Sequence, residues 1–314
     1  MRVEGASVVR PRALRSGDLV GVCAPAGVVD PERLARGVAA LEGLGLRVRV
    51  TEGTVGRQFF TSGPARARRD ELVGLFTDPE VAAIVCARGG AGAGALLPLL
   101  DPAVLRGHPK LFVGCSDITF LHLFLDQLGL VSVHGPMVMG DLADGSYDEP
   151  SLRQALFGEG SPWRSDPEDL VTLRPGDGEG VLLGGCLSIL AAAAGTPWAL
   201  RPRPAGTLLF LEDVHERPFR IDRMLGQLRH SGAFAGLRGI VFGDMKGCAP
   251  KLDEGYTLEA VILEALDGLD VPVALGLSSG HAANPAVSLP LGVRARLRAD
   301  GASATFEILE PAAL

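Results

Sequence analysis

Residues 18–51 read DLVGVCAPAGVVDPERLARGVAALEGLGLRVRVT, and this stretch decides the fold. It opens with an apolar run at 18–24 and closes with a β-branched run at 47–51. Between the two runs, Asp30 can cap a helix and Pro31 can open it, and leucines then recur at helical spacing. A strand, a helix and a second strand in this order predict parallel strands joined by a crossover helix.

The first half of the chain continues this alternation. A helix is expected over Ala65–Phe76, with strands at Val81–Ala87 and Leu111–Gly114. The sequence therefore predicts an α/β fold, with a doubly wound parallel sheet in an N-terminal domain over residues 14–145. Glycine, proline, serine and acidic residues concentrate over 146–178, which is typical of a linker region between domains.

A C-terminal domain is expected over residues 179–312, where strands and helices are more mixed. Its predicted elements are strands at Thr207–Leu211, Gly239–Phe242 and Val271–Leu275, and helices at Pro218–Leu228 and Leu258–Leu266. The tail from Ala286 to Ile308 alternates short apolar runs with glycine turns. That pattern predicts antiparallel strands.

Composition excludes several classes of protein. With 314 residues, 47% hydrophobic and 21% charged, the chain is long and apolar enough to form a globular core. The net charge of −7 disfavours nucleic-acid binding. The five cysteines are odd in number and widely spaced, so they favour buried thiols in a cytoplasmic protein over disulfides or a zinc site, and we expect neither a metal nor a cofactor.

We also expect neither export nor a membrane span. The N-terminal segment lacks the continuous apolar region of a signal peptide. Residues Val181–Leu200 contain no charge and are long enough to cross a bilayer, but they include Gly184, Gly185, Gly195 and Pro197. A strand end followed by a buried helix is the better interpretation.

The sharpest local feature is LFVGCSDITFLHL at residues 111–123, where an apolar strand turns abruptly into a helix at Ser116. A nucleophile elbow needs this arrangement, because it presents a hydroxyl at the carboxyl edge of a sheet, beside helical N–H groups. The alternative is that Ser116 or Asp117 only caps the helix. Ile118 also stands where the last glycine of the G-x-S-x-G motif would be.

A catalytic serine needs a base, and six histidines compete for that role. His281 ranks first because it follows a predicted strand in a glycine-containing loop, and His134, at the end of another strand, ranks second. For the acid that orients the base, Glu212 is the first polar side chain after an apolar strand. The neighbouring acids Asp213 and Glu216 could instead serve the start of a helix.

A glycine-rich turn follows the third predicted strand. Gly90, Gly92 and Ala95 match the dinucleotide fingerprint G-x-G-x-x-A, but they do so after the wrong strand. The same glycines could bring a backbone N–H close to Ser116 as half of an oxyanion hole. We favour the second interpretation.

Taken together, these segments resemble a known family, the LD-carboxypeptidases of peptidase family S66. The segments that match it, in chain order, are GDLVGV with Ala24-Pro25, RGGAG at 88–92, GCSD at 114–117, HGP at 134–136, GG at 184–185 through GTP at 195–197, LED at 211–213, DRML at 222–225 and GH at 280–281. Each segment by itself is a weak indication of the family, but the set in this order is specific to it and spans nearly the whole chain.

The resemblance implies a catalytic triad of Ser116, His281 and Glu212, with the N–H groups of Gly90 and Asp117 as the oxyanion hole. It also implies a flavodoxin-like N-terminal domain, a smaller swivelling α/β C-terminal domain and a homodimer. Ala91 and Cys115 depart from the family, which often has aromatic residues at those positions. Glu216 remains a rival to Glu212.

The implied activity is release of terminal D-alanine from a murein tetrapeptide in peptidoglycan recycling. The substrate carboxylate would need a cation, and the candidates are Arg88, Arg217, Arg220 and Arg223. Arg88 and Arg223 are the arginines chosen as substrate-binding candidates, together with Glu216. Two alternatives stay open: a peptidase of the microcin C immunity kind, which cleaves peptidyl or aminoacyl nucleotides, and a non-catalytic dinucleotide-binding protein.

Overall fold

The computed structural model describes residues 8–160, 162–166, 168–282, 285–301 and 303–314. The chain forms two compact units, and each is described by itself. The first unit comprises Met1–Ser161, Pro285–Gly292 and Pro311–Leu314, and the second comprises Pro162–Asn284 and Val293–Glu310. Two short segments from the end of the chain therefore belong to the first unit.

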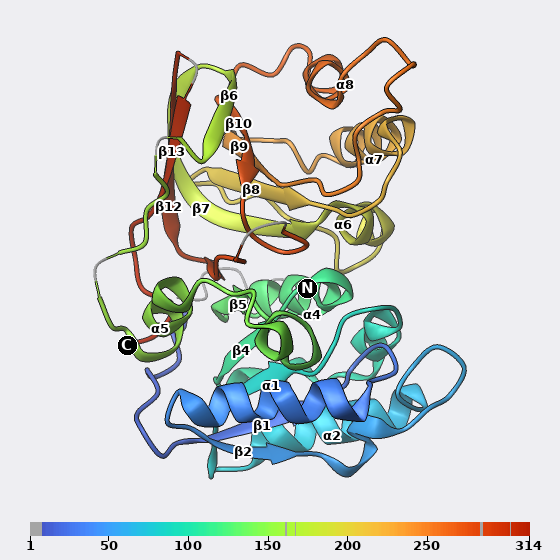
Figure 1. The fold of residues 1–314 in the computed structure, drawn as a ribbon, viewed down its shortest axis with the longest axis vertical. Helices are drawn as coiled ribbons and strands as arrows, with labels where there is room; N and C mark the ends of the chain where they lie inside the picture. The colour runs from blue at the N-terminus through green and yellow to red at the C-terminus, as the bar shows by residue number, and fades with distance from the viewer. Residues whose placement is uncertain (1–7, 161, 167, 283–284, 302) are drawn as a thin grey trace. The chain divides into compact units, whose positions relative to one another are not determined.

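The first unit is built on a six-stranded sheet in the order β11-β5-β4-β3-β1-β2. Strands β1, β2, β4 and β5 of this sheet are labelled in Figure 1. Its strands are β1 (Leu19–Cys23), β2 (Arg47–Val50), β3 (Val81–Cys86), β4 (Leu111–Gly114), β5 (Ser132–His134) and β11 (Leu289–Leu291). The first five pair in parallel, which confirms the predicted parallel sheet. β11 pairs antiparallel with β5, so one tail strand completes a sheet formed by the start of the chain.

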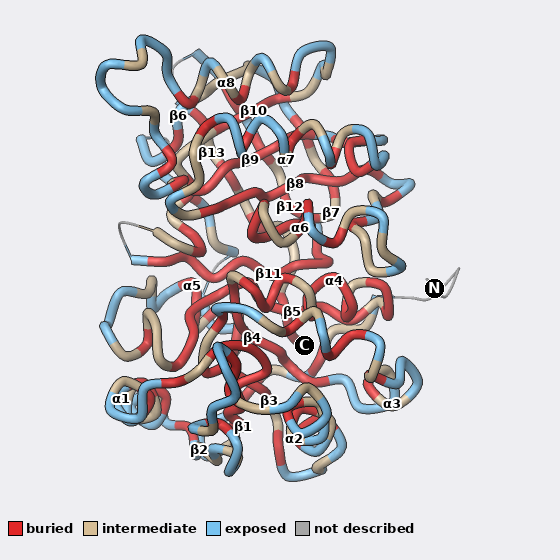
Figure 2. Tube along the Cα trace, turned by 90° about the vertical axis from the view of Figure 1, so that its right-hand side faces the viewer, coloured by how far each residue is buried: buried red, intermediate tan, exposed pale blue. Residues whose placement is uncertain are grey.

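Helices connect these strands, as the crossover pattern predicts. They are α1 (Pro31–Gly43), α2 (Ala65–Thr77), α3 (Pro102–Gly107) and α4 (Thr119–Gln127), and a further helix, α5 (Glu149–Phe157), follows β5. The Asp30 side chain accepts a hydrogen bond from the N–H of Arg33, and Pro31 occupies the first turn of α1, so both predicted start signals are confirmed. Strands β1, β3 and β4 are almost entirely buried, whereas β2 forms a partly exposed edge (Figure 2).

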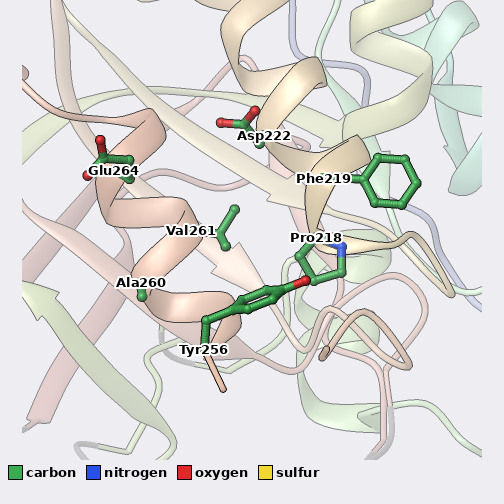
Figure 3. Close-up of a pocket in the computed structure, with 7 residues that line it drawn as sticks. All are labelled: Pro218, Phe219, Asp222, Tyr256, Ala260, Val261 and Glu264. Atoms are coloured by element: carbon green, nitrogen blue, oxygen red, sulfur yellow. The ribbon is translucent and has the colours of Figure 1, made fainter. Parts of the chain in front are cut away.

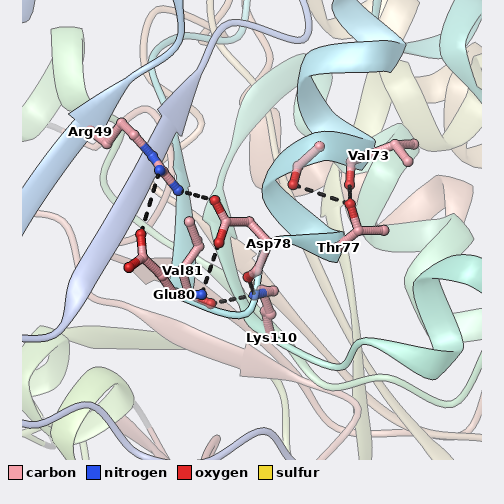
Figure 4. Close-up of polar contacts among 8 residues, drawn as sticks. Arg49, Val73, Thr77, Asp78, Glu80, Val81 and Lys110 are labelled. Carbon is pink, nitrogen blue, oxygen red and sulfur yellow. Dashed lines mark hydrogen bonds and ion pairs between the residues drawn. The ribbon is translucent and has the colours of Figure 1, made fainter.

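The turn between α2 and β3 is held by a buried lysine (Figure 4). The Lys110 ammonium donates to the backbone carbonyls of Asp78 and Val81, and its burial lowers its pKa. On the other side of the turn, the Asp78 carboxylate pairs with Arg49 of β2. These contacts close the amino-terminal edge of the sheet, opposite the edge where the glycine turn and Ser116 follow β3 and β4.

The second unit is a closed barrel in the order β10-β6-β13-β12-β7-β8-β9. Its strands are β6 (Leu170–Arg174), β7 (Gly176–Cys186), β8 (Thr207–Glu212), β9 (Leu237–Gly243), β10 (Val273–Leu277), β12 (Arg294–Asp300) and β13 (Ser303–Ile308), and its helices are α6 (Leu187–Ala193), α7 (Pro218–His230) and α8 (Leu258–Ala265). Strands β7 to β10 pair in parallel, and β12 and β13 are antiparallel, as the tail pattern predicts.

The segment 146–178, which composition predicts to be a linker, contains much regular structure. It includes α5, β6 and the first residues of β7, while residues 161 and 167 lie outside the described part. The uncharged stretch Val181–Leu200 forms the end of β7 and the buried helix α6, which confirms the interpretation from sequence. In the described residues, no helix combines the length and the apolar character that crossing a bilayer requires.

Candidate active site

Ser116 has the backbone of a nucleophile elbow. It follows β4 at the carboxyl edge of the parallel sheet and has a φ of +60°, in the left-handed region that non-glycine residues rarely adopt. The residue before the bend, Gly114, has to be small, because a Cβ there would lie 2.9 Å from the Ile118 side chain. Strain at one residue of a strand-to-helix turn is typical of a functional site.

The capping alternative does not fit the geometry. Helix α4 begins at Thr119 with Ile118 at its N-cap, and no side chain makes a capping hydrogen bond there. The short turn Ser116–Ile118 before it also lacks a side-chain cap. Ser116 is therefore strained without serving the helix start.

The glycine turn after β3 lies directly against Ser116. A Cβ placed on Gly89 would be 2.8 Å from the Ser116 Cβ, 3.1 Å from its Oγ and 3.3 Å from the backbone nitrogen of Asp117. Only glycine allows this approach. Gly90 follows with a φ of +93°, and the Gly89 carbonyl accepts a hydrogen bond from the N–H of Gly27 at 2.8 Å.

The turn does not have the structure that the dinucleotide interpretation requires. That fingerprint opens an α-helix whose N-terminus holds the pyrophosphate. Here the glycines lead into a 3₁₀ segment, Ala93–Leu99, which contains Pro98. The contact between Gly89 and Ser116 favours the oxyanion-hole interpretation instead.

In the second unit, Glu212 and His281 form a hydrogen-bonded pair. Glu212 ends β8 and is 1% exposed, and one of its oxygens, Oε2, lies 2.8 Å from His281 Nδ1. The same oxygen accepts the backbone N–H of His281 at 3.2 Å. A carboxylate at Nδ1 stabilises the tautomer with its proton on that nitrogen, so Nε2 is the nitrogen that can accept a proton.

Two glycines make room for the Glu212 side chain. A Cβ on Gly280, whose φ is +76°, would lie 2.5 Å from the Glu212 carboxyl carbon. A Cβ on Gly243, at the end of β9, would lie 2.8 Å from the Glu212 Cβ. Glycine is therefore required before His281 both because a side chain there would collide with Glu212 and because the backbone is left-handed.

The neighbouring acids make other contacts. Glu216 accepts a hydrogen bond from Arg220 at 3.3 Å, one turn further along the chain. Asp213 is buried and accepts the N–H of Ser188 at 2.7 Å, at the start of α6, and burial raises its pKa. Of the three acids, Glu212 is therefore the one that contacts His281.

The two histidines of the first unit that lie near the sheet are structural. His134 is fully buried in β5, so its ring is not exposed to solvent. His122 is also buried, with Nε2 2.8 Å from the Gly114 carbonyl and Nδ1 2.8 Å from the Ser132 hydroxyl. Burial lowers the pKa of His122 to about 3, so this ring is neutral at physiological pH.

The candidate substrate-binding arginines lie in different surroundings. Arg88 follows β3, and its Nε would lie 3.6 Å from a Cβ placed on Gly90. Arg217 pairs with Glu254, and Arg223 lies over the ring of Phe219 at 5.7 Å. Of these candidates, Arg88 is therefore the arginine beside the glycine turn, and its Nη1 donates to the Val28 carbonyl.

A cavity of about 470 Å³ lies between α7 and α8 of the second unit (Figure 3). Its lining combines apolar and aromatic side chains with two acids: Pro218, Phe219, Asp222, Tyr256, Ala260, Val261 and Glu264. Neither Glu212 nor His281 lines this cavity. It is therefore separate from the histidine-carboxylate pair.

Sequence comparison connects these features with known proteins. Residues 20–135 match the LD-carboxypeptidase N-terminal domain of peptidase family S66, and residues 179–297 match its C-terminal domain. A probable murein peptide carboxypeptidase from Bacillus subtilis is 38% identical over 305 residues, covering 95% of this chain and 94% of the relative. The microcin C7 self-immunity protein MccF of Escherichia coli is 28% identical, with 90% of each chain covered.

Structural comparison gives a consistent result. The crystal structure of muramoyltetrapeptide carboxypeptidase from Oxalobacter formigenes has a TM-score of 0.81 and 30% sequence identity, and the match covers 93% of this chain and 99% of that one. Both domains of the family are thus matched in order, and a relative well above 30% identity covers almost the whole chain. This chain belongs to the LD-carboxypeptidases of peptidase family S66.

Proposed function

We propose that the protein is a serine carboxypeptidase that removes the terminal D-alanine of a murein tetrapeptide by cutting an L,D amide bond. The observation that carries this proposal is the left-handed backbone of Ser116 at the bend after β4, packed against Gly89. Family membership and the names of the Bacillus and Oxalobacter relatives support the same substrate class.

In the proposed reaction, Ser116, His281 and Glu212 act as a triad. His281 Nε2 takes the hydroxyl proton while Ser116 Oγ bonds to the substrate carbonyl carbon, and the carbonyl oxygen becomes an oxyanion. The N–H groups of Gly90 and Asp117 would stabilise that charge. When the C–N bond breaks, His281 returns the proton to the nitrogen of D-alanine, and water then hydrolyses the acyl-enzyme by the same route.

The contacts of each residue support this division of roles. Glu212 is buried and bonded to Nδ1, so it can stabilise the imidazolium that forms when His281 takes the proton. Arg88, beside the glycine turn, is the best-supported ligand for the terminal carboxylate of the substrate. Glu216 and Arg223 remain weaker proposals for substrate binding.

Further features of the family are proposed with the activity. The strand order β2-β1-β3-β4-β5 supports a flavodoxin-like first unit, and we propose a swivelling second domain and a homodimer. The five cysteines are buried thiols, all of them among the described residues, and this supports a cytoplasmic location for peptidoglycan recycling.

The test is to incubate the purified protein with murein tetrapeptide and to follow D-alanine by mass spectrometry. We expect the wild type to release D-alanine, and Ser116→Ala and His281→Ala to be nearly inactive. Release that persists in Ser116→Ala would refute the triad. Glu212→Gln and Glu216→Gln form a matched pair, and a larger loss in Glu216→Gln would transfer the orienting role to that acid.

The microcin-immunity alternative is favoured by one observation, the 28% identity to the E. coli immunity protein over 90% of both chains. Aminoacyl-sulfamate nucleotides should be assayed beside the tetrapeptide. Cleavage of the nucleotides alone would replace the recycling assignment and keep the serine mechanism.

A further inference from the structure

Arg68, in the first turn of α2, is a buried arginine that contacts three loops. Its residue is 5% exposed. Nε donates to the Gly63 carbonyl at 2.8 Å, and Nη1 donates to the Gly92 carbonyl at 2.9 Å and to the Pro25 carbonyl. Burying a guanidinium is costly, and burial lowers the pKa of Arg68, so packing alone does not explain its position.

Asp117 holds the other side of the same glycine turn. This residue, directly after Ser116, is 3% exposed, and its Oδ2 accepts the N–H of Ala93 at 2.7 Å. The carbonyl of Gly92 is thus held by Arg68, and the N–H of the next residue is held by Asp117. Burial raises the pKa of Asp117 and lowers the pKa of Arg68, and the attraction between the two opposite charges opposes both shifts.

The turn needs this support because it has almost no side chains of its own. Gly90 has a φ of +93° and Gly92 a φ of +116°, and glycine loses more conformational freedom on ordering than any other residue. Its first residue, Gly89, is held by the N–H of Gly27. Without Arg68 and Asp117, the last residues of the turn would lose both side-chain hydrogen bonds, and the Gly92 carbonyl would keep only the N–H of Ala95 at 3.3 Å.

We propose that Arg68 and Asp117 are a positioning pair that fixes the turn from Gly89 to Ala93, so that the Gly90 N–H is held ready beside Ser116. Neither side chain is required to touch the substrate. The proposal rests on the proposed function only in taking Gly90 as an oxyanion donor. Donors held in advance stabilise the transition state more than the bound substrate, so the pair should affect kcat rather than KM.

The first experiment compares Arg68→Met with Arg66→Met, an exposed arginine on the same helix. We expect Arg68→Met to lower kcat for D-alanine release about 10²- to 10³-fold with little change in KM, the loss typical of removing one oxyanion donor. Arg66→Met should match the wild type. An unchanged kcat in folded Arg68→Met, or a loss confined to KM, would overturn the proposal.

The second experiment separates positioning from folding. Asp117→Asn can still accept the Ala93 N–H, but it leaves the Arg68 charge buried without its acid, so its melting temperature should fall. The double variant Arg68→Met with Asp117→Asn removes both charges. We expect its kcat to be no lower than that of Arg68→Met alone, because the two side chains act as a unit. Strictly multiplicative losses would contradict the pairing.

The third experiment does not depend on the substrate. A fluorophosphonate probe reacts with an activated serine at phosphorus: the bond from Ser116 Oγ to phosphorus forms, the P–F bond breaks and fluoride leaves. The phosphoryl oxygen gains negative charge in the five-coordinate transition state, so the labelling rate depends on the oxyanion donors. The labelling rate of Ser116 should fall about 10²-fold or more in Arg68→Met and stay unchanged in Arg66→Met. If the wild type is labelled but releases no D-alanine, the substrate assignment fails, and slower labelling of Arg68→Met still supports the positioning pair. Equal labelling of the wild type and Arg68→Met refutes the pair.

Discussion

Replacing Gly280 with alanine tests whether the glycine before His281 exists to seat the Glu212 carboxylate. A Cβ at this position would lie 2.5 Å from the Glu212 carboxyl carbon and 2.7 Å from its Oε2, roughly 1 Å inside normal contact. The φ of +76° adds left-handed strain of about 1–2 kcal/mol. Crowding in a packed site adds about 1–3 kcal/mol, so Gly280→Ala should lose about 2–5 kcal/mol of unfolding free energy.

Gly232→Ala is the matched control in the same unit. Gly232 has a φ of +83°, and a Cβ there would meet no atom within 4 Å. It should therefore show the left-handed strain alone, about 1–2 kcal/mol. The difference between the two variants isolates the displacement of Glu212.

Urea unfolding and D-alanine release measure the two consequences. Because the displaced carboxylate can no longer hold the His281 ring, kcat in Gly280→Ala should fall by a factor of about 10² to 10⁴, towards the loss seen when the acid of a triad is replaced. Gly232→Ala should keep the wild-type kcat. Equal stability losses in the two variants, with full activity in Gly280→Ala, would refute the steric argument.

Three other predictions follow from the first unit. In urea unfolding, Ser116→Gly should be more stable than Ser116→Ala by about 1 kcal/mol, because alanine keeps the left-handed strain at a φ of +60°. Both variants should be inactive. Equal stability of the two variants would argue against strain at this residue. His122 has a folded pKa of about 3, below its unfolded value, so its contribution to stability is present above about pH 6.5 and is lost as pH falls towards 3. Unfolding free energy measured across that range should show a steeper fall in the wild type than in His122→Gln, and identical slopes would contradict this. Lys110→Met should lower the unfolding free energy by about 1–3 kcal/mol, because the backbone carbonyls of Asp78 and Val81 lose their donor. A chemical denaturation midpoint equal to that of the wild type would show that water replaces the ammonium.

Local sequence signals were sufficient for the elements of the parallel sheet. Strand β4 was predicted with its observed bounds, and α1 begins at Pro31 after the Asp30 cap, because capping and helical periodicity act over a few neighbouring residues. The sharp bend at Ser116 was also visible, since it needs a small residue before it and an apolar strand leading to it.

Contacts between residues far apart in sequence could not be predicted in this way. The linker composition of 146–178 did not indicate β6 (Leu170–Arg174), whose partners β10 (Val273–Leu277) and β13 (Ser303–Ile308) lie far along the chain. Nor did Arg68 stand out, because an arginine in a helical pattern normally faces solvent, and its carbonyl partners belong to three separate loops.

The sequence by itself thus determined the parallel α/β unit and the family, and it indicated Ser116 and His281 as the proposed nucleophile and base, because these depend on local patterns and on the order of short motifs. The tertiary structure decided which acid contacts His281, which end strand joins the first sheet and how the second unit closes into a barrel. Each of these depends on hydrogen bonds between distant segments, and such pairing is set by packing in three dimensions rather than by the propensity of any one segment.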